Sequence, residues 1–312
     1  MELIFCGTPS FAMPTLDRLI AAGHRISLVV TQPDQPSGRG LEVATSPVKQ
    51  RALALGLHVI QPDKIKTNEA FRSQLESLKP EAIIVVGYGR IIPRWMIDLP
   101  RHGNLNLHAS LLPKYRGAAP IQWAIANGET VTGVTTMRID EGLDTGDILL
   151  QQEVAIAPHD TALTLAPRLA DVGAGLMVET LRQLQAGTLA ARPQDQAQST
   201  LAPLLKKGDG RIDFSWTAGD IHNRLRGFQP WPGVYTTFRG KSLALRAAQP
   251  VTGITAPSAE FRVEHERLLL GCGRGTVLEV LELQPEGKKR MAARDFVHGY
   301  HPHPGERLGE PS

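Results

Sequence analysis

Cysteine is almost absent from this sequence, since its 312 residues include only Cys6 and Cys272. Two cysteines cannot form a disulfide framework or a cysteine-rich metal site, and they favour a reducing cytosol. Long hydrophobic runs are absent too, because no stretch approaches the roughly 18 apolar residues of a membrane span. The acidic Glu2 and the short apolar run after it differ from a secretory signal peptide. We therefore expect a cytoplasmic protein without a membrane anchor.

A dinucleotide-binding fingerprint is also missing. The first expected strand-to-helix turn contains Gly7 but lacks the G-x-G-x-x-G spacing, which argues against a nicotinamide or flavin cofactor. A glycine after the first strand can mark a phosphate-binding turn. Pro9, near the first helical turn, favours the simpler interpretation of a tight structural turn.

Positive charge exceeds negative charge only toward the C-terminus. Residues 1–205 contain 18 Lys/Arg and 19 Asp/Glu, a net charge of −1, whereas residues 206–312 contain 16 and 12, a net charge of +4. A basic C-terminal third suits a polyanionic partner such as a nucleic acid. A solvated basic surface without a binding role explains the same counts, so both interpretations stay open.

Short apolar strands alternate with helical stretches through the first half of the chain. Unbroken Ile/Val runs, such as residues 82–86, are typical of parallel strands buried on both faces. The alternation predicts an α/β domain with a doubly wound, mostly parallel, Rossmann-like sheet. The expected strands are residues 2–6, 26–31, 57–60, 82–86, 131–139 and 148–156, and the expected helices are 11–22, 47–55, 69–78 and 161–185.

The pattern changes after the last of these helices. Residues 186–201 are rich in Gly, Gln, Ala and Pro, as linkers are. Short strands and glycine-rich turns follow and predict an all-β module such as a small OB-like barrel. We expect an N-terminal domain over residues 1–189, a linker over 190–205 and a C-terminal β-barrel domain over 206–312.

Polar side chains alternate with leucines where one strand is expected to end. Asn106, His108 and Ser110 would share one face of that strand, because side chains alternate with a period of two. The carboxyl edge of a parallel sheet is where α/β enzymes place their sites. A surface strand whose polar face meets water would give the same pattern.

An acidic loop over residues 140–147 holds four acids and two glycines. It could bind a divalent cation, although the alternation of a Ca²⁺ loop is absent. It could instead supply one carboxylate to the same cleft, or be a solvated turn.

Three motifs together resemble a known family. They are N-L-H-x-S-L-L-P at residues 106–113, R-G-A-x-P at 116–120 and D-x-G-x-D-x-G-D at 140–147. With them the chain resembles the 10-formyltetrahydrofolate-dependent formyltransferase family. Further motifs at residues 5–12, 32–40, 228–233 and 287–291 resemble the branch that formylates aminoacyl-tRNA, and the match covers nearly the whole chain in order.

The resemblance implies roles for particular residues. The family's catalytic residues correspond to Asn106, His108 and Asp144. The co-substrate 10-formyltetrahydrofolate would bind at Ser110, Leu111, Leu112 and Pro113, with its pterin in a pocket of residues 86–92, including Val86, Gly87, Tyr88 and Ile91, and the backbone of Arg138 and Asp140. The tRNA contacts would include Arg39, in the loop over residues 33–47, and the start of the basic module at Lys206 and Lys207. Residues 41–45 of that loop depart from the lysine-rich pattern that is common in the family.

The implied acceptor is the amino group of methionine on initiator methionyl-tRNA, whose attack on the formyl carbon gives a tetrahedral oxyanion. Asn106 and His108 would donate hydrogen bonds to that oxygen. Asp144 would orient His108, favour its charged form and take the proton of the amine. The reaction needs no metal, and we expect the chain to act as a monomer.

Three alternatives share part of this pattern. A purine-pathway formyltransferase usually has a G-S-N turn after its first strand and lacks the long C-terminal domain. A nucleotide-sugar formyltransferase can carry a barrel-like C-terminal domain and is the stronger rival. A tRNA-binding module without catalysis is the third, and the presence of all three matched catalytic residues argues against it.

Overall fold

The computed structural model describes residues 1–37, 42–303 and 305–309. Contacts divide the chain into two compact units, each built from more than one stretch of sequence. The first unit contains Met1–Pro120, Val131–Ala155 and Ala166–Pro203. The second unit contains Ile121–Thr130, Ile156–Leu165 and Leu204–Ser312.

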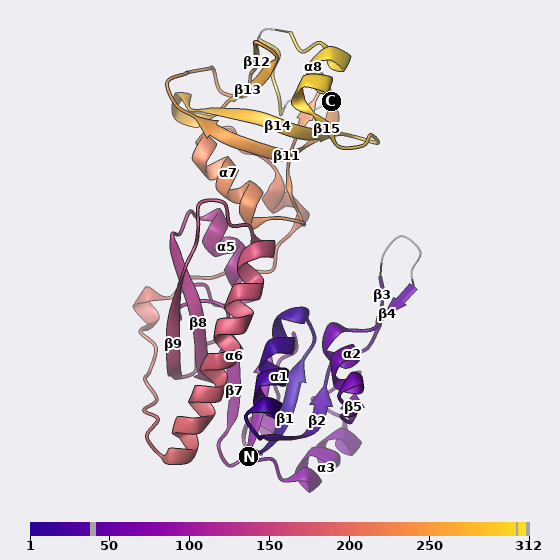
Figure 1. The fold of residues 1–312 in the computed structure, drawn as a ribbon, viewed down its shortest axis with the longest axis vertical. Coiled ribbons are helices and arrows are strands. Elements are labelled where there is room, and N and C mark those ends of the chain that lie inside the picture. The colour runs from indigo at the N-terminus through magenta and orange to yellow at the C-terminus, as the bar shows by residue number, and fades with distance from the viewer. Residues whose placement is uncertain (38–41, 304, 310–312) are drawn as a thin grey trace. The chain divides into compact units, whose positions relative to one another are not determined.

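A seven-stranded sheet forms the centre of the first unit (Figure 1). Its order is β5 (Val59–Ile60), β2 (Arg25–Val30), β1 (Glu2–Gly7), β6 (Ala82–Val86), β7 (Asn104–His108), β8 (Val131–Arg138) and β9 (Ile148–Ala155). The ladders from β5 to β7 are parallel, and those that join β8 and β9 are antiparallel. A separate short hairpin pairs β3 (Gln35–Ser37) with β4 (Glu42–Ala44).

The helices of the first half begin where the sequence offers caps. The side chains of Ser46 and Asn68 accept backbone hydrogen bonds and start two of them. The helices that connect or follow the strands are α1 (Met13–Ala21), α2 (Pro47–Ala54), α3 (Glu69–Leu78), α4 (Arg94–Ile97), α5 (Pro120–Ala126) and α6 (Ala162–Ala186). Short 3-10 turns are η1 (Ser10–Ala12), η2 (Gln196–Gln198), η3 (Lys207–Gly210) and η4 (Gly273–Gly275).

The predicted α/β class and mostly parallel sheet are confirmed, and β6 and α3 have the predicted bounds. All five residues of β6 are buried, as expected for a strand covered on both faces. In the ladders, Gly7 lies opposite Val86, and Val85 lies opposite Asn106. The carboxyl ends of β1, β6 and β7 therefore meet at one edge of the sheet.

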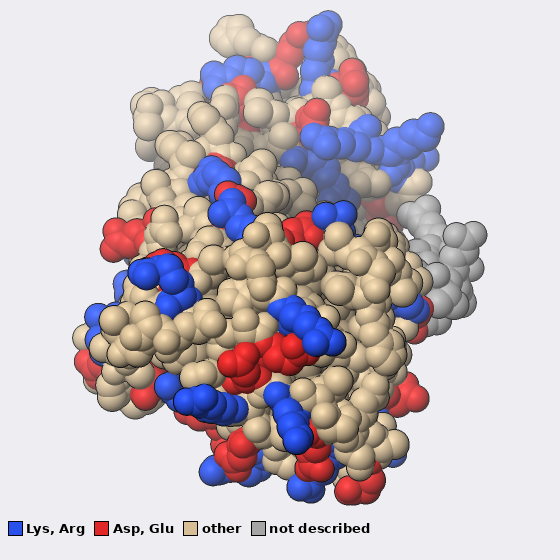
Figure 2. Space-filling model, turned by 60° about the horizontal axis from the view of Figure 1, so that its bottom comes forward, with Lys and Arg blue, Asp and Glu red and all other residues tan. Residues whose placement is uncertain are grey.

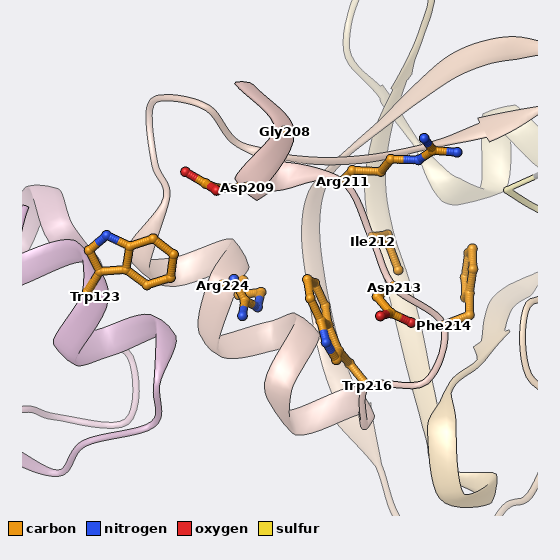
Figure 3. A pocket seen from close by; sticks show the side chains of 9 residues that line it. All are labelled: Trp123, Gly208, Asp209, Arg211, Ile212, Asp213, Phe214, Trp216 and Arg224. Atoms are coloured by element: carbon orange, nitrogen blue, oxygen red, sulfur yellow. The ribbon is translucent and has the colours of Figure 1, made fainter. Parts of the chain in front are cut away.

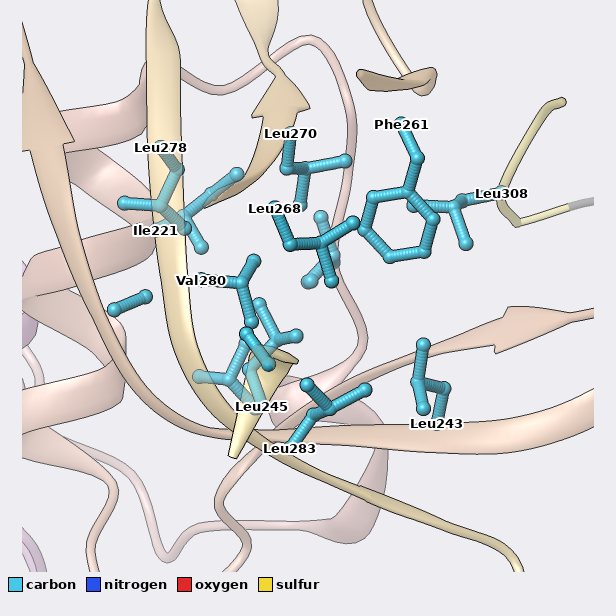
Figure 4. Close-up of a cluster of buried hydrophobic side chains, with 14 of the residues drawn as sticks. Ile221, Leu243, Leu245, Phe261, Leu268, Leu270, Leu278, Val280, Leu283 and Leu308 are labelled. Atoms are coloured by element: carbon cyan, nitrogen blue, oxygen red, sulfur yellow. The ribbon is translucent and has the colours of Figure 1, made fainter. Parts of the chain in front are cut away.

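The second unit holds an antiparallel sheet in the order β10 (Val234–Phe238), β11 (Lys241–Val251), β14 (Val277–Pro285), β13 (Arg267–Gly271) and β12 (Phe261–Glu264), with β15 (Met291–Ala292) on β14. Two helices, α7 (Ala218–Gly227) and α8 (Ala293–Tyr300), belong to the same unit. Leucines of the strands pack with Ile221 of α7 and with Phe261 in one buried cluster (Figure 4). The predicted β-rich C-terminal module is confirmed, while its ladders among the described residues form an open path rather than a closed barrel.

The stretch that the composition indicates as a linker makes regular backbone contacts within the first unit. Arg116 and Leu201 form a parallel bridge, and the backbone N–H of Ala202 donates to the carbonyl of Arg116 at 2.7 Å. Ile148 and Arg192 exchange backbone hydrogen bonds across an antiparallel bridge. The segment thus pairs with the start of β9 at Arg192 and with the loop that follows β7 at residues 200–202.

Candidate active site at the carboxyl edge of the first sheet

Strand β7 places Asn106 and His108 on one face. The opposite face is occupied by Leu107, since a Cβ atom on Gly173 of α6 would lie only 2.7 Å from the Leu107 side chain. Because neighbouring residues of a strand alternate between faces, Asn106 and His108 point away from α6. Asn106 pairs in register with Val85 and Met137, so it lies between β6 and β8 near the edge where the strands end.

His108 is nearly buried, with 6% of its surface exposed. Its Nε2 atom lies 2.9 Å from the carbonyl oxygen of Tyr115. A carbonyl only accepts hydrogen bonds, so Nε2 carries a proton and donates it. Its Nδ1 atom lies 3.7 Å from Oδ2 of Asp144, too far for a direct hydrogen bond. The Nδ1 edge of the ring is therefore the edge that remains for a substrate.

Asp144 is held by the loop that follows β7. Its Oδ2 atom accepts a hydrogen bond from the backbone N–H of Gly117 at 2.8 Å. Gly117 has φ of 117°, and a Cβ there would lie 2.8 Å from the carbonyl oxygen of Ala202. Asp144 itself has a positive φ of 52°, which is uncommon for a residue with a side chain. Two unusual backbone conformations thus aim one carboxylate toward His108, and such outliers are typical of functional sites.

The S-L-L-P segment forms the turn after β7. Ser110 is fully buried, and its hydroxyl donates to the carbonyl of Lys114 at 2.6 Å. The N–H of Leu112 donates to Thr135 on β8, and the bond between Leu112 and Pro113 is cis. Ser110 therefore fixes the shape of the turn instead of extending the strand, and its hydroxyl is engaged within the protein.

The turn after β6 lies beside this segment. Gly87 and Gly89 have positive φ, and a Cβ atom would lie 2.8 Å from Pro9 at the first and 2.4 Å from Gln32 at the second. Tyr88 between them is buried, and burial raises the pKa of its hydroxyl above the ordinary value. The Tyr88 hydroxyl has no hydrogen-bond partner among the described residues. Ile91, by contrast, is 89% exposed and offers an apolar surface.

The acidic loop is an ordered turn. Asp140 accepts hydrogen bonds from the N–H of Gly142 and from the hydroxyl of Thr145. The backbone of Arg138 leads into this turn, and its N–H donates to the carbonyl of Asp147 at 2.9 Å. Within the described residues, no group of three or more His, Cys, Asp or Glu side chains could hold a metal ion.

Gln194 is a site residue that the sequence patterns did not indicate. Its side-chain nitrogen donates to the carbonyls of Asp144 (2.8 Å) and Gly146 (2.7 Å). Its side-chain oxygen accepts two hydrogen bonds from the buried guanidinium of Arg116. Gln194 thus ties the acidic loop to the loop after β7. Arg116 lies in the R-G-A motif, but a glutamine within a Gln-rich stretch gives no comparable signal.

The expected tRNA contacts belong to other segments of the chain. Arg39 lies outside the described residues. Lys206 and Lys207 are exposed in the second unit, where the backbone N–H of Lys206 donates to Asp209 at the start of η3. In the described part of the chain, no helix is long and apolar enough to cross a membrane.

Comparisons with known proteins agree along the whole chain. Residues 1–181 match the formyl transferase family, and residues 204–301 match the formyl transferase C-terminal domain. The methionyl-tRNA formyltransferase of Koribacter versatilis is 63% identical over 309 residues, which cover 99% of both chains. That of Acidobacterium capsulatum is 62% identical over 310 residues, which cover 99% of this chain and 100% of the relative.

A solved structure extends the likeness to the fold. The N-formyltransferase from Helicobacter canadensis, in complex with folinic acid and dTDP-3-aminofucose, matches with a TM-score of 0.69 at 19% identity. The match covers 91% of this chain and 99% of that one. At this level of identity, the likeness concerns the fold alone.

Proposed function

This chain belongs to the methionyl-tRNA formyltransferase family, and we propose that it transfers the formyl group of 10-formyltetrahydrofolate to the α-amino group of methionine on initiator tRNA. One observation supports this most directly. Asn106, His108 and Asp144 come together at the carboxyl edge of the sheet, with 3.7 Å between Nδ1 of His108 and Oδ2 of Asp144. At that distance the two side chains are close enough to contact one reacting centre, and neither is committed to a direct hydrogen bond with the other.

The proposed reaction begins when the amine attacks the formyl carbon and the carbonyl oxygen becomes an oxyanion. Asn106 and Nδ1 of His108 donate hydrogen bonds to that oxygen, because the Asn106 amide has no partner among the described residues and Nε2 of His108 is committed to Tyr115. Fixed donors at a developing negative charge stabilise a transition state strongly, since they need no reorganisation. A doubly protonated ring would present a hydrogen to Tyr115 and another to the oxyanion.

Asp144 acts as the proton acceptor in this proposal. The attacking amine must lose a proton, and the nitrogen of folate must gain one as its bond to the formyl carbon breaks. A carboxylate beside the reacting carbon can carry that proton between the two nitrogens. The hydrogen bond from Gly117 keeps the carboxylate in place.

The two turns at the sheet edge suit a flat co-substrate such as folate. Gly87 and Gly89 let the turn after β6 pack closely against Pro9 and Gln32, so that the backbone at this edge of the sheet keeps a fixed shape. The exposed Ile91 provides apolar surface beside them. We propose that the pterin binds against Val86–Ile92 and the backbone of Arg138 and Asp140, and that the S-L-L-P turn forms the neighbouring wall.

The proposed binding of the tRNA acceptor is argued from the charge of the protein. We propose that Lys206 and Lys207, together with Arg39, contact tRNA phosphates. Figure 2 shows a face on which basic and acidic side chains are interspersed, and a mixed surface of this kind attracts a polyanion weakly. The excess of Lys and Arg after residue 205 is the better candidate for phosphate contacts. Since all three catalytic residues come from one chain and the acceptor is a tRNA, we propose that the chain acts as a monomer in the cytoplasm.

Formyl transfer to charged tRNA tests this function. The full chain is incubated with 10-formyltetrahydrofolate and methionine-charged initiator tRNA, with methionine-charged elongator tRNA as the matched control. We expect transfer to the initiator and little to the elongator. Transfer to a nucleotide-linked amino sugar, with none to either tRNA, would keep the catalytic residues and overturn the acceptor. Light scattering of the same preparation tests the monomer.

A further inference from the structure

The second unit contains a cleft between two tryptophans (Figure 3). Its volume is about 600 Å³, a size common among sites for small ligands. Trp123 comes from α5, Trp216 from the turn before α7, and Arg224 projects from α7 between them. The carboxylates of Asp209 and Asp213 also line the cleft.

Arg224 is the unusual member of this set. Its guanidinium carbon lies 3.9 Å from the ring centre of Trp216 and 5.8 Å from that of Trp123. The Arg224 guanidinium makes no hydrogen bond or ion pair with any residue in the part of the chain that the structure describes. A guanidinium has five N–H donors, and partial burial in an aromatic cleft limits their access to water. The cleft therefore offers a flat cation whose donors are available to a ligand.

The aromatic walls are held in place. The N–H of Gly273 donates to the carbonyl of Trp216 at 2.7 Å, and the N–H of Trp216 donates to Asp213 at 3.0 Å. A Cβ on Gly273 would meet the carbonyl oxygen of Ser215, so the close approach requires glycine. On the other wall, the Trp123 ring packs edge-to-face on Phe228, with centres 5.2 Å apart. A ligand that stacks here would need little rearrangement of the protein.

The charges of the cleft select among ligand classes. Asp209 and Asp213 offset the charges of Arg211 and Arg224, so that the lining does not favour a bare phosphate. A purely apolar molecule would leave Arg224 without a partner. The backbone N–H of Ser215 lowers the pKa of Asp213 below its ordinary value, so that this group is an acceptor at neutral pH. A nucleobase fits all of these conditions. It has a flat face for the indoles and guanidinium, acceptors for Arg224, and exocyclic amino groups that can donate to the carboxylates.

We propose that this cleft binds an unpaired nucleobase of the tRNA acceptor, stacked against Trp123, Arg224 and Trp216. The proposal rests on the proposed function for the identity of the RNA, but the chemistry of the cleft stands on its own residues. Adenine, guanine and cytosine carry exocyclic amino groups and uracil does not, so we expect a uridine oligonucleotide to bind more weakly.

Fluorescence anisotropy with short RNAs tests the cleft directly. The full chain is titrated into a labelled adenosine tetranucleotide and into an abasic tetranucleotide with the same sugar–phosphate backbone. We expect the base-bearing strand to bind roughly tenfold more tightly, because base stacking adds to phosphate attraction. Equal affinities for the two strands would overturn the proposal.

Variants assign the effect to the cleft. Arg224→Gln and Trp216→Ala should remove most of the difference between the two strands and leave binding of the abasic strand nearly unchanged. The matched controls are Arg294→Gln on α8, which removes the same charge from an exposed arginine, and Trp231→Ala, which removes a tryptophan that is 53% exposed and lies outside the cleft. Both controls should keep the tenfold difference. If Trp216→Ala lowers thermal stability, the test rests on two other comparisons. These are the affinity of Arg224→Gln for the base-bearing strand and the affinities of the wild-type protein for the two strands.

Two further results distinguish base binding by RNA from binding of free nucleotides and from the proposed formyl transfer. If adenosine monophosphate competes as well as the tetranucleotide, the cleft takes free nucleotides and the assignment to RNA is wrong. The titrations contain neither folate nor tRNA, so they are independent of formyl transfer. Intact transfer without base-dependent binding would sink this inference alone, whereas base-dependent binding without transfer would sink only the proposed function.

Discussion

At the sheet edge of the first unit, Asp144 and His108 already have hydrogen-bond partners in the protein, whereas the Arg224 guanidinium in the cleft of the second unit has no hydrogen-bond or ion-pair partner among the described residues. Asp144 accepts from Gly117, and His108 donates to Tyr115. Arg224 contacts the aromatic rings of Trp216, Trp123 and Phe228. The contrast separates two tasks. An active site must fix its catalytic groups before the substrate arrives. A recognition cleft must keep hydrogen-bond donors and acceptors available for the ligand.

The folds explain how each unit achieves this. Parallel strands end at a common edge, so that short turns after β1, β6 and β7 meet and can hold each other through backbone hydrogen bonds. The antiparallel sheet of the second unit buries most of its leucines in one cluster, and the turn before α7 carries aromatic side chains that are only partly buried.

Removing the charge of Asp144 should give the largest loss of activity. Asp144→Asn keeps an oxygen for the N–H of Gly117, so the loop should hold, but the amide cannot take a proton from the amine. We expect a fall in the single-turnover rate on the order of 10²–10⁴. Glu141→Gln, which neutralises an exposed acid of the same loop, should retain nearly the full rate. A rate for Asp144→Asn near that of Glu141→Gln would show that the carboxylate only holds the loop.

The next effect concerns Asn106, whose side-chain amide has no hydrogen-bond partner among the described residues. Asn106→Ala should lower the rate by about 10²–10³, since it removes one hydrogen bond to the oxyanion. Binding of tRNA, measured by filter retention, should stay within about twofold, because the proposed phosphate contacts lie elsewhere. An equal loss of binding and rate would instead mean that Asn106 supports the local fold.

Much of the reacting site could be predicted from the sequence because its residues are neighbours in the chain. Asn106 and His108 lie two apart on one strand, and the alternation with leucines places them on one face. β6 and α3 could be predicted for the same reason, since their patterns are local.

Contacts that join distant segments could not be predicted in this way. Gln194 lies 50 residues from Asp144, in a stretch whose Gly, Gln and Pro content is that of a linker. Trp123 and Arg224 are 101 positions apart in the sequence, and nothing local marks them as neighbours. Only the fold shows that the polar segment around Gln194, which has little tendency to form helix or strand, is fixed by hydrogen bonds to the loop that contains Asp144.

Substitutions at Gln194 test how the first unit positions Asp144, and we expect a smaller effect on the rate. Gln194→Ala removes the donors to the carbonyls of Asp144 and Gly146 and should lower the rate about tenfold, as slight misplacement of a reacting group does. Gln194→Glu keeps an acceptor for Arg116 but not the donors, so it should be similarly slow. Gln198→Ala, an exposed neighbour that contacts Asp195, is the control and should be unaffected. A normal rate for Gln194→Glu would assign the role to Arg116 alone.

The smallest effect is expected in the second unit and concerns pH. Nδ1 of His222 on α7 donates to the carbonyl of Ala248 at 2.9 Å. Burial lowers the pKa of His222 from its ordinary value of 6.5; the hydrogen bond to Ala248 opposes this shift, and the charge of Arg226 adds to it. Because the folded pKa is the lower one, the unfolded chain binds more protons below pH 6.5. The contribution of His222 to stability is therefore present above pH 6.5 and lost as the pH falls toward the folded value.

His222→Asn isolates that contribution, because asparagine can still donate to the Ala248 carbonyl but does not titrate. Calorimetric melting of the wild type should shift to lower temperature between pH 7 and pH 5, and the variant should show a shallower shift. His298→Gln on α8 replaces an exposed histidine of the same unit and should keep the wild-type slope. If the slopes of His222→Asn and wild type coincide, the groups that destabilise the chain in acid lie elsewhere. A shallower slope would show that the partly buried His222 makes the second unit less stable when it becomes charged.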